Sequence, residues 1–215
     1  VAEQMIIPSD HILLDVAKNL PAIVVVRHAS GVPHFVVCWR RDGDYVQLMD
    51  PATGRHFQHS ATFLQRLFVH AQAMPVAAIR KWLGGSGFVR PLTARMRQLD
   101  VPRAQEDKLL QDAKSQRSWQ RWAQLDAAVR MAADLVAARA LTPGAEVGRF
   151  IEVLTNQTDA AQIPDSYWTV RALPGEAGGK ADVVLLRGAV LVAIRGRKNE
   201  DAAQVAQRLS ALPAD

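Results

Sequence analysis

The hydrophobic pattern changes along the chain, from short β-type runs to helical periodicity. Residues 22–27, 34–40 and 44–50 form apolar runs rich in Val, Phe, Tyr and Trp, and each predicts a strand. The Val-Val-Val run of the first suits a strand that is buried on both faces. Arg41-Asp42-Gly43 links the other two runs, and so short a link containing Gly predicts a β-hairpin.

Helical spacing is expected over 10–19, over about 60–69 with Ser60 as the N-cap, and from about residue 104 onward. Thr142-Pro143 predicts the start of another helix, because Thr favours the N-cap and Pro the first turn. An apolar stripe in the middle of the chain is typical of a buried helix face rather than a ligand site. Its members are Trp119, Trp122, Leu125, Val129, Ala132 and Val136.

The C-terminal part predicts strands over 167–171, 182–187 and 189–195, with a turn at Arg187-Gly188 between the last two. Residues 201–212 have the spacing of an amphipathic helix. With a hinge at the glycine-rich residues 84–87, the pattern predicts an α+β protein of two domains. The first covers residues 1–90 and is antiparallel; the second, over 100–215, is an accessory domain of helices and a β-hairpin.

Composition narrows the class of protein. The 215 residues are 49% hydrophobic and 22% charged, as in an ordinary globular protein, and a single Cys excludes an internal disulfide. The single Cys gives no sign of an oxidising compartment, so we expect a cytoplasmic location, and no apolar run approaches the ~20 residues of a membrane helix. Residues 80–139 carry twelve basic and six acidic groups, but the two signs alternate as on a solvated helix face. A nucleic-acid partner is therefore not expected.

The hairpin brings two candidate catalytic residues together. A three-residue loop at 41–43 would pair Arg40 with Asp44, Val36 with Leu48, and His34 with Asp50, and opposed side chains in an antiparallel pair lie ~4.5–5.5 Å apart at Cβ. A carboxylate held against a His ring nitrogen suits a general base. A buried His satisfied by an Asp at a strand end would have the same spacing. A one-residue slip of the register would separate the pair.

Three segments resemble a known family. Leu-Pro-Ala-Ile-Val-Val at 20–25, His-Phe-Val-Val at 34–37 and Met-Asp-Pro-Ala-Thr-Gly at 49–54 are similar to the bacteriocin-processing cysteine peptidase domain of ABC exporters, which cuts leader peptides after a double glycine. The resemblance covers only the C-terminal half of that domain. It implies a papain-like fold, His34 as general base and Asp50 as its orienting residue. It also implies a leader peptide and the membrane and ATPase parts of a transporter as partners, on the cytoplasmic side of an inner membrane.

The family's nucleophilic Cys and the Gln that precedes it have no counterpart here. Cys38 lies four residues beyond His34 on the same predicted strand, roughly 13 Å away at ~3.3 Å per residue, so it suits a buried strand position. Two interpretations remain open. The chain is part of a longer peptidase that has the Cys, or it is a degenerate member that only binds a peptide or partner. In either case we expect this chain alone to be inactive.

Other candidate sites are weaker. His56 and His59 lie close together but lack a third ligand, so neither a metal nor a cofactor is expected. Both faces of the predicted hairpin are apolar, so a face left uncovered would favour self-association. The second half also fits a winged helix, but Arg149 is the only basic residue of its reading helix, and it lies between Glu146 and Glu152.

Overall fold

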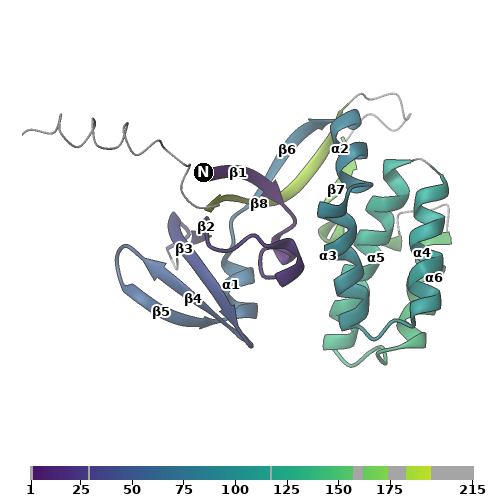
Figure 1. Cartoon of the computed structure of the whole chain (residues 1–215), viewed down its shortest axis with the longest axis horizontal. Helices are drawn as coiled ribbons and strands as arrows, with labels where there is room; N and C mark the ends of the chain where they lie inside the picture. The colour runs from purple at the N-terminus through teal and green to yellow at the C-terminus, as the bar shows by residue number, and fades with distance from the viewer. Residues whose placement is uncertain (1, 29, 117, 157–161, 174–182, 195–215) are drawn as a thin grey trace, which may run out of the picture.

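The computed structural model describes residues 2–28, 30–116, 118–156, 162–173 and 183–194, which form an α+β structure around one antiparallel sheet (Figure 1). The main order of strands is β1-β8-β2-β3-β4-β5, and β6 and β7 also pair with β8. The strands are β1 (Ala2–Ile7), β2 (Ala22–Arg27), β3 (Pro33–Asp42), β4 (Tyr45–Asp50), β5 (Gly54–His59), β6 (Val69–Pro75), β7 (Val170–Ala172) and β8 (Val183–Ile194).

β8 joins the two parts of the chain. Its first half pairs with β6 and β7, and its second half pairs with β1 and β2. The turn predicted at Arg187-Gly188 is wrong, because one strand runs straight through both residues. A Cβ at Gly188 would lie 2.2 Å from the Ile7 carbonyl oxygen, so this glycine permits the close approach of β1 rather than a change of direction.

The helices cover one part of the sheet. They are α1 (Ser60–Arg66), α2 (Val76–Leu83), α3 (Ser86–Gln98), α4 (Arg103–Ser115), α5 (Trp119–Ala137) and α6 (Ala145–Asn156), with short 3-10 turns η1 (Ser9–His11), η2 (Asp15–Ala17) and η4 (Asp165–Tyr167). Figure 1 shows α3, α4, α5 and α6 side by side, away from β3, β4 and β5. None of the helices described is long and apolar enough to cross a bilayer.

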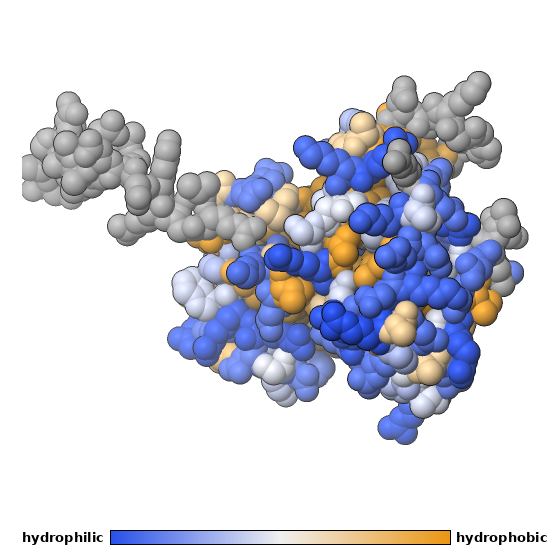
Figure 2. All heavy atoms as spheres, turned by 45° about the vertical axis from the view of Figure 1, so that its right-hand side comes forward, coloured by the Kyte–Doolittle hydropathy of each residue, from blue (hydrophilic) through white to orange (hydrophobic). Residues whose placement is uncertain are grey.

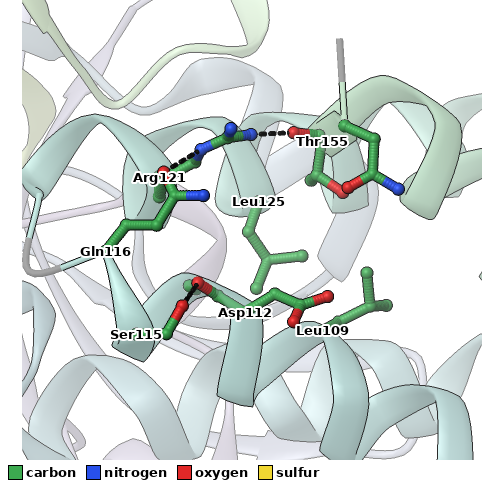
Figure 3. A pocket seen from close by; sticks show the side chains of 9 residues that line it. Leu109, Asp112, Ser115, Gln116, Arg121, Leu125 and Thr155 are labelled. Carbon is green, nitrogen blue, oxygen red and sulfur yellow. Dashed lines mark hydrogen bonds between the residues drawn. The ribbon is translucent and has the colours of Figure 1, made fainter. Parts of the chain in front are cut away.

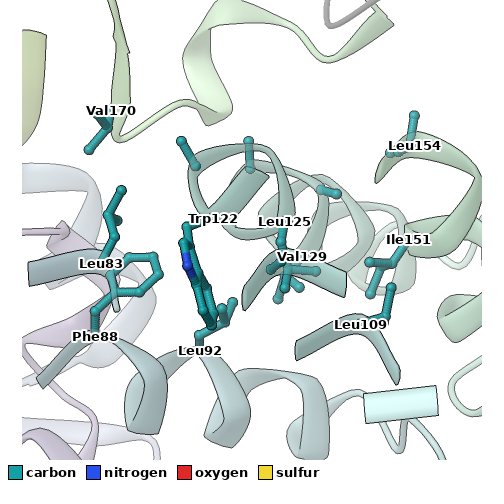
Figure 4. Packing of buried hydrophobic residues seen from close by; sticks show 14 of the residues in the cluster. Leu83, Phe88, Leu92, Leu109, Trp122, Leu125, Val129, Ile151, Leu154 and Val170 are labelled. Atoms are coloured by element: carbon teal, nitrogen blue, oxygen red, sulfur yellow. The ribbon is translucent and has the colours of Figure 1, made fainter. Parts of the chain in front are cut away.

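The larger hydrophobic core lies among these helices and the first half of β8. The predicted stripe of α5 is buried there from Trp119 to Ala132. In Figure 4 the Trp122 ring points toward Phe88, and the centroids of the two rings are 6.4 Å apart. Val184 of β8 belongs to the same core, so the sheet and the helices share one packed interior.

A second core lies on the inner face of the sheet, which we define as the face bearing Val24, Val36, Cys38 and Leu48. Phe63 of α1 covers this face, together with Ile12 and Leu13 of the segment after η1. In Figure 2 the helices present mainly hydrophilic side chains, and hydrophobic ones gather toward the centre of the view.

Some predicted elements differ from the structure. The helix expected over 10–19 is replaced by η1 and η2, because Leu14 is extended between the two turns and the left-handed Lys18 ends the second. β1, β5 and β6 were not predicted, and the N-cap of α1 is His59, whose ring accepts a hydrogen bond from Ala61 N. The helix expected over 201–212 lies outside the described residues.

Candidate functional site

The hairpin of β3 and β4 carries the two predicted site residues, but the predicted register is wrong. The turn has two residues rather than three, since Asp42 pairs with Tyr45, and Gly43 has a φ of +58°, which glycine adopts without strain. A β-bulge between Cys38 and Arg40 then inserts Trp39, so Cys38 pairs with Leu48. The pairing near His34 is therefore shifted by two positions from the prediction.

The bulge decides which face His34 occupies. The two-residue turn alone would put His34 and Asp50 on opposite faces, because it changes the register by an odd number of residues. The extra residue at the bulge makes the total shift even, so both side chains lie on the inner face. Asp50 stands diagonal to His34, at a Cα separation of ~7–8 Å that long side chains can bridge.

The two side chains meet. His34 Nε2 lies 2.8 Å from Asp50 Oδ1, as the sequence interpretation requires. The same carboxylate oxygen accepts a hydrogen bond from Ala52 N at 2.8 Å, an Asx-turn that fixes the Asp50 side chain just before Pro51. We call His34 and Asp50 the dyad. Its carboxylate is held by the backbone as well as by the ring.

One ring nitrogen of the dyad remains open. Among the described residues His34 Nδ1 has no hydrogen-bond partner, and the His34 side chain keeps 27% of its surface exposed against 11% for Asp50. The nearest ring is that of His28, whose centroid lies 6.4 Å away at an edge-on angle. With a carboxylate bound to Nε2 and with Nδ1 accessible, the His34 ring can accept a proton at Nδ1 from a bound group.

Hydrogen bonding keeps the Asp50 carboxyl ionised. The hydrogen bond from Ala52 N, followed by that from His34, holds the pKa of Asp50 below its usual value. An ionised carboxylate can stabilise the imidazolium that forms when His34 takes a proton. The local electrostatics therefore suit an orienting residue.

Cys38 is a core residue. It is fully buried on the inner face, and burial raises the pKa of its thiol to about 12. A thiol with that pKa stays protonated at neutral pH and is a poor nucleophile. The structure thus places Cys38 where the sequence predicted it.

A network of four charged residues, of which Arg95 and Asp126 are buried, was not predicted. Arg95 of α3 binds Asp10 of η1 at 2.7 Å and also binds Asp126 of α5, while Arg130 of α5 binds Asp126 at 2.6 Å and Asp10 at 3.0 Å. Arg130 also donates to Thr169. Only the i,i+4 spacing of Asp126 and Arg130 signals this network in the sequence, since its other members are far apart in the chain.

The arginines of the network keep its two carboxyl groups ionised. Burial opposes ionisation of Asp10 and Asp126, but the guanidinium groups of Arg130 and Arg95 outweigh it and hold both carboxyl pKa values below the usual range. Beside them, burial lowers the pKa of His11 to about 4, although Asp10 partly offsets it. His11 Nε2 has no hydrogen-bond partner among the described residues, so His11 is a neutral, buried ring.

The dyad lines neither of two cavities in the described part of the chain. A cleft of about 1150 Å³ lies over the charged network, between η1, α1, α3 and α5, and neither His34 nor Asp50 lines it. A smaller cavity of about 200 Å³ lies beside Arg121, which donates to Gln116 at 2.6 Å and also to Thr155 (Figure 3). That volume is below the ~300 Å³ at which ligand pockets begin.

His56 and His59 lie on β5. His56 pairs with Leu48 of β4, and its ring contacts the Gly54 carbonyl oxygen, whereas His59 caps α1. No group of three His, Cys, Asp or Glu residues that could hold a metal occurs in the described part of the chain.

Comparisons with models of protein families, with characterised proteins and with solved structures give no match to this chain.

Proposed function

We propose that residues 1–90 form the C-terminal, sheet-containing part of a papain-like leader-peptidase domain, in which His34 is the general base and Asp50 orients it. The observation that carries this proposal is the 2.8 Å contact between His34 Nε2 and Asp50 Oδ1, with Nδ1 left open. The domain would act on the leader of an exported peptide, on the cytoplasmic side of an ABC transporter, with cleavage after a double glycine.

The chemistry would use Nδ1 of His34 for each proton transfer, while Nε2 stays bound to Asp50. Nδ1 accepts the proton of an attacking thiol while the sulfur bonds to the carbonyl carbon of the scissile peptide. The imidazolium, stabilised by Asp50, gives that proton to the leaving amine as the C–N bond breaks. Water, activated by the same nitrogen, then hydrolyses the thioester and restores the thiol.

The thiol would have to come from another polypeptide segment. Cys38 is the only Cys of the sequence, and its side chain is buried and protonated. This observation favours a second candidate function, a catalytically inactive domain that binds a peptide or a partner on the same scaffold. Both functions use the same scaffold, but only the peptidase requires a peptide to lie against His34 and the ring to transfer a proton.

Peptide binding tests the proposal. We expect a peptide with a Gly-Gly site to bind the chain and to shift the NMR signals of the His34 ring, whereas a matched Ala-Ala peptide binds more weakly. No hydrolysis should occur. The measurement is a titration of His-labelled protein, with His34→Gln to assign the signal and His56→Gln as a control on a neighbouring strand.

The outcomes separate the candidates. Binding that shifts His34 and favours Gly-Gly supports the leader-peptidase site. Binding of both peptides that leaves His34 unchanged supports a partner-binding domain and contradicts the catalytic role. A complete lack of binding by either peptide contradicts the leader-peptidase site and any peptide-binding role.

A further inference from the structure

The cleft over the charged network has the size and the position of a ligand site. Its volume of about 1150 Å³ is slightly above the ~300–1,000 Å³ of most small-molecule pockets. Leu13 of the inner-face core and Leu99 of the helical core both line it, so the cleft lies where the two cores meet. Ligand sites are common at such junctions.

Two arginines that line the cleft have no carboxylate partner among the described residues. Arg41 of β3 donates from Nε to the Gly43 carbonyl oxygen at 2.9 Å, and Arg187 of β8 donates from Nη1 to the Asp165 carbonyl oxygen at 3.2 Å. These contacts engage one nitrogen of each guanidinium, and the other nitrogens can bind an oxyanion.

The acidic residues of the cleft are already engaged. Asp10 accepts hydrogen bonds from both arginines of the network, and Asp134 is hydrogen-bonded to the Tyr167 side chain. The four charges of the network cancel one another, so Arg41 and Arg187 face only Asp134 and leave one net positive charge. The cleft is therefore complementary to an anion.

Apolar surface lies directly beside Arg187. Val69 pairs with Ala189, two residues beyond Arg187 on β8, so the Val69 and Arg187 side chains are diagonal neighbours on one face. Val69 is 40% exposed and lines the cleft, as does the nearby Leu64 of α1. A ligand with an apolar body and an anionic end would contact both kinds of surface.

The network fixes the wall that carries Arg187. Arg130 of α5 donates to the Thr169 hydroxyl and to the Tyr167 carbonyl oxygen, which anchors the segment after η4. Thr169 O in turn accepts the backbone N–H of Arg187 at 2.7 Å. A wall that is held in place before binding lowers the entropic cost of ordering it around a ligand.

We propose that this cleft binds a small amphipathic anion. Its carboxylate or phosphate lies at Arg187, and its apolar body lies against Val69 and Leu64. Arg41 adds a weaker, more exposed attraction. The site is distinct from the dyad, which does not line the cleft, and it requires no proton transfer by His34.

Three probes of equal chain length test the proposal by titration calorimetry of the full chain. They are decanoate, decyl phosphate and the neutral decanol, each at a concentration where it is monomeric. We expect one molecule of at least one of the two anions to bind about tenfold more tightly than decanol, because a charged hydrogen bond contributes ~1.5–3 kcal/mol. The anion that binds more tightly identifies the ligand as a carboxylate or a phosphate ester.

Arg187→Gln should remove the advantage of the anions and leave the affinity for decanol unchanged. Arg149→Gln, which removes the same charge from the exposed side of α6, should have no effect on any probe. Val69→Asp places a carboxylate beside Arg187 and should abolish binding of the anions, whereas Val153→Asp on α6 should not. Circular dichroism and the urea midpoint establish that each variant is folded.

Four results would overturn the proposal. They are a failure of both anions to bind, equal affinity for the anions and decanol, anion binding that survives Arg187→Gln and Val69→Asp in folded protein, and loss of binding in Phe35→Ser. Phe35 lies on the opposite face of the sheet and is 62% exposed, so that last result would assign the probes to another surface. A failure here leaves the role of His34 untouched, since none of these readouts involves the dyad.

Discussion

Two sites hold carboxylates against cationic or ionisable partners, and they differ in how many charged partners each carboxylate has. Asp10 borders the cleft, and 31% of its side chain is exposed. Asp10 and Asp126 share Arg95 and Arg130, and the Asp126 side chain is only 1% exposed. In the dyad, Asp50 occupies one nitrogen of His34 and leaves the other accessible. The comparison indicates that the network fixes the fold, whereas the dyad keeps one atom available for chemistry.

The two sites also arise differently. The network is built by residues from η1, α3 and α5, and it ties the loop after β1 to the helices. The dyad depends on one turn and one bulge within a single hairpin. Loss of a charge should therefore damage the whole structure at the network, but only the local ring geometry at the dyad.

Removal of the buried charge at Asp126 should have the largest effect. We expect Asp126→Asn to lower the free energy of unfolding by about 3–5 kcal/mol, because Arg95 and Arg130 lose a carboxylate partner in a buried place. Urea denaturation measures the change. Asp50→Asn, the matched variant at the dyad, should shift the urea midpoint far less.

A double variant isolates the cause. Asp126→Leu with Arg95→Met removes one charge of each sign and leaves Arg130 beside Asp10, so most of the lost stability should return. Equal destabilisation by Asp126→Asn and Asp50→Asn would contradict the distinction between a network that stabilises the whole fold and a local pair.

His11, next to the network, should make stability depend on pH. Its pKa is about 4 in the folded protein and ~6.5 when unfolded, so the unfolded chain binds more protons between these values. Stability should therefore fall by about 3 kcal/mol as the pH decreases from 7 to 4. Urea titrations across this range measure it, and His11→Leu should show a correspondingly smaller decrease. An unchanged slope in that variant would mean that His11 is not the titrating group.

Alternation of side chains predicted part of the site before the register was known. His34, Val36 and Cys38 share a face because strand side chains alternate, and Leu48 and Asp50 do so for the same reason. The length of the turn and the bulge at Trp39 could not be predicted, since an Arg-Asp-Gly-Asp segment fits more than one turn. The predicted turn was one residue too long and the bulge was missed, but the two errors together shift the strand register by an even number of residues. His34 and Asp50 therefore still share a face.

The rest of the fold depends on contacts between distant segments. Glycine at position 188 is a residue typical of turns. Here, however, its missing side chain is needed for the close approach of Ile7, about 180 residues earlier in the chain. The network was not predicted because two of its four members, Asp10 and Arg95, lie far in the sequence from the other two. Patterns along the chain predict strands and helices, but they do not show which strand a distant glycine will meet.

The tautomer of His34 tests the central claim most directly. Nitrogen-15 NMR of His-labelled protein, at a pH where the ring is neutral, should find the proton on Nε2, with Nδ1 unprotonated, and Asp50→Asn should weaken this preference. Such a ring is set to accept a proton at Nδ1. A proton on Nδ1 in the wild type, or a tautomer ratio that Asp50→Asn does not alter, would contradict the assignment of His34 and Asp50 as a base and its orienting residue.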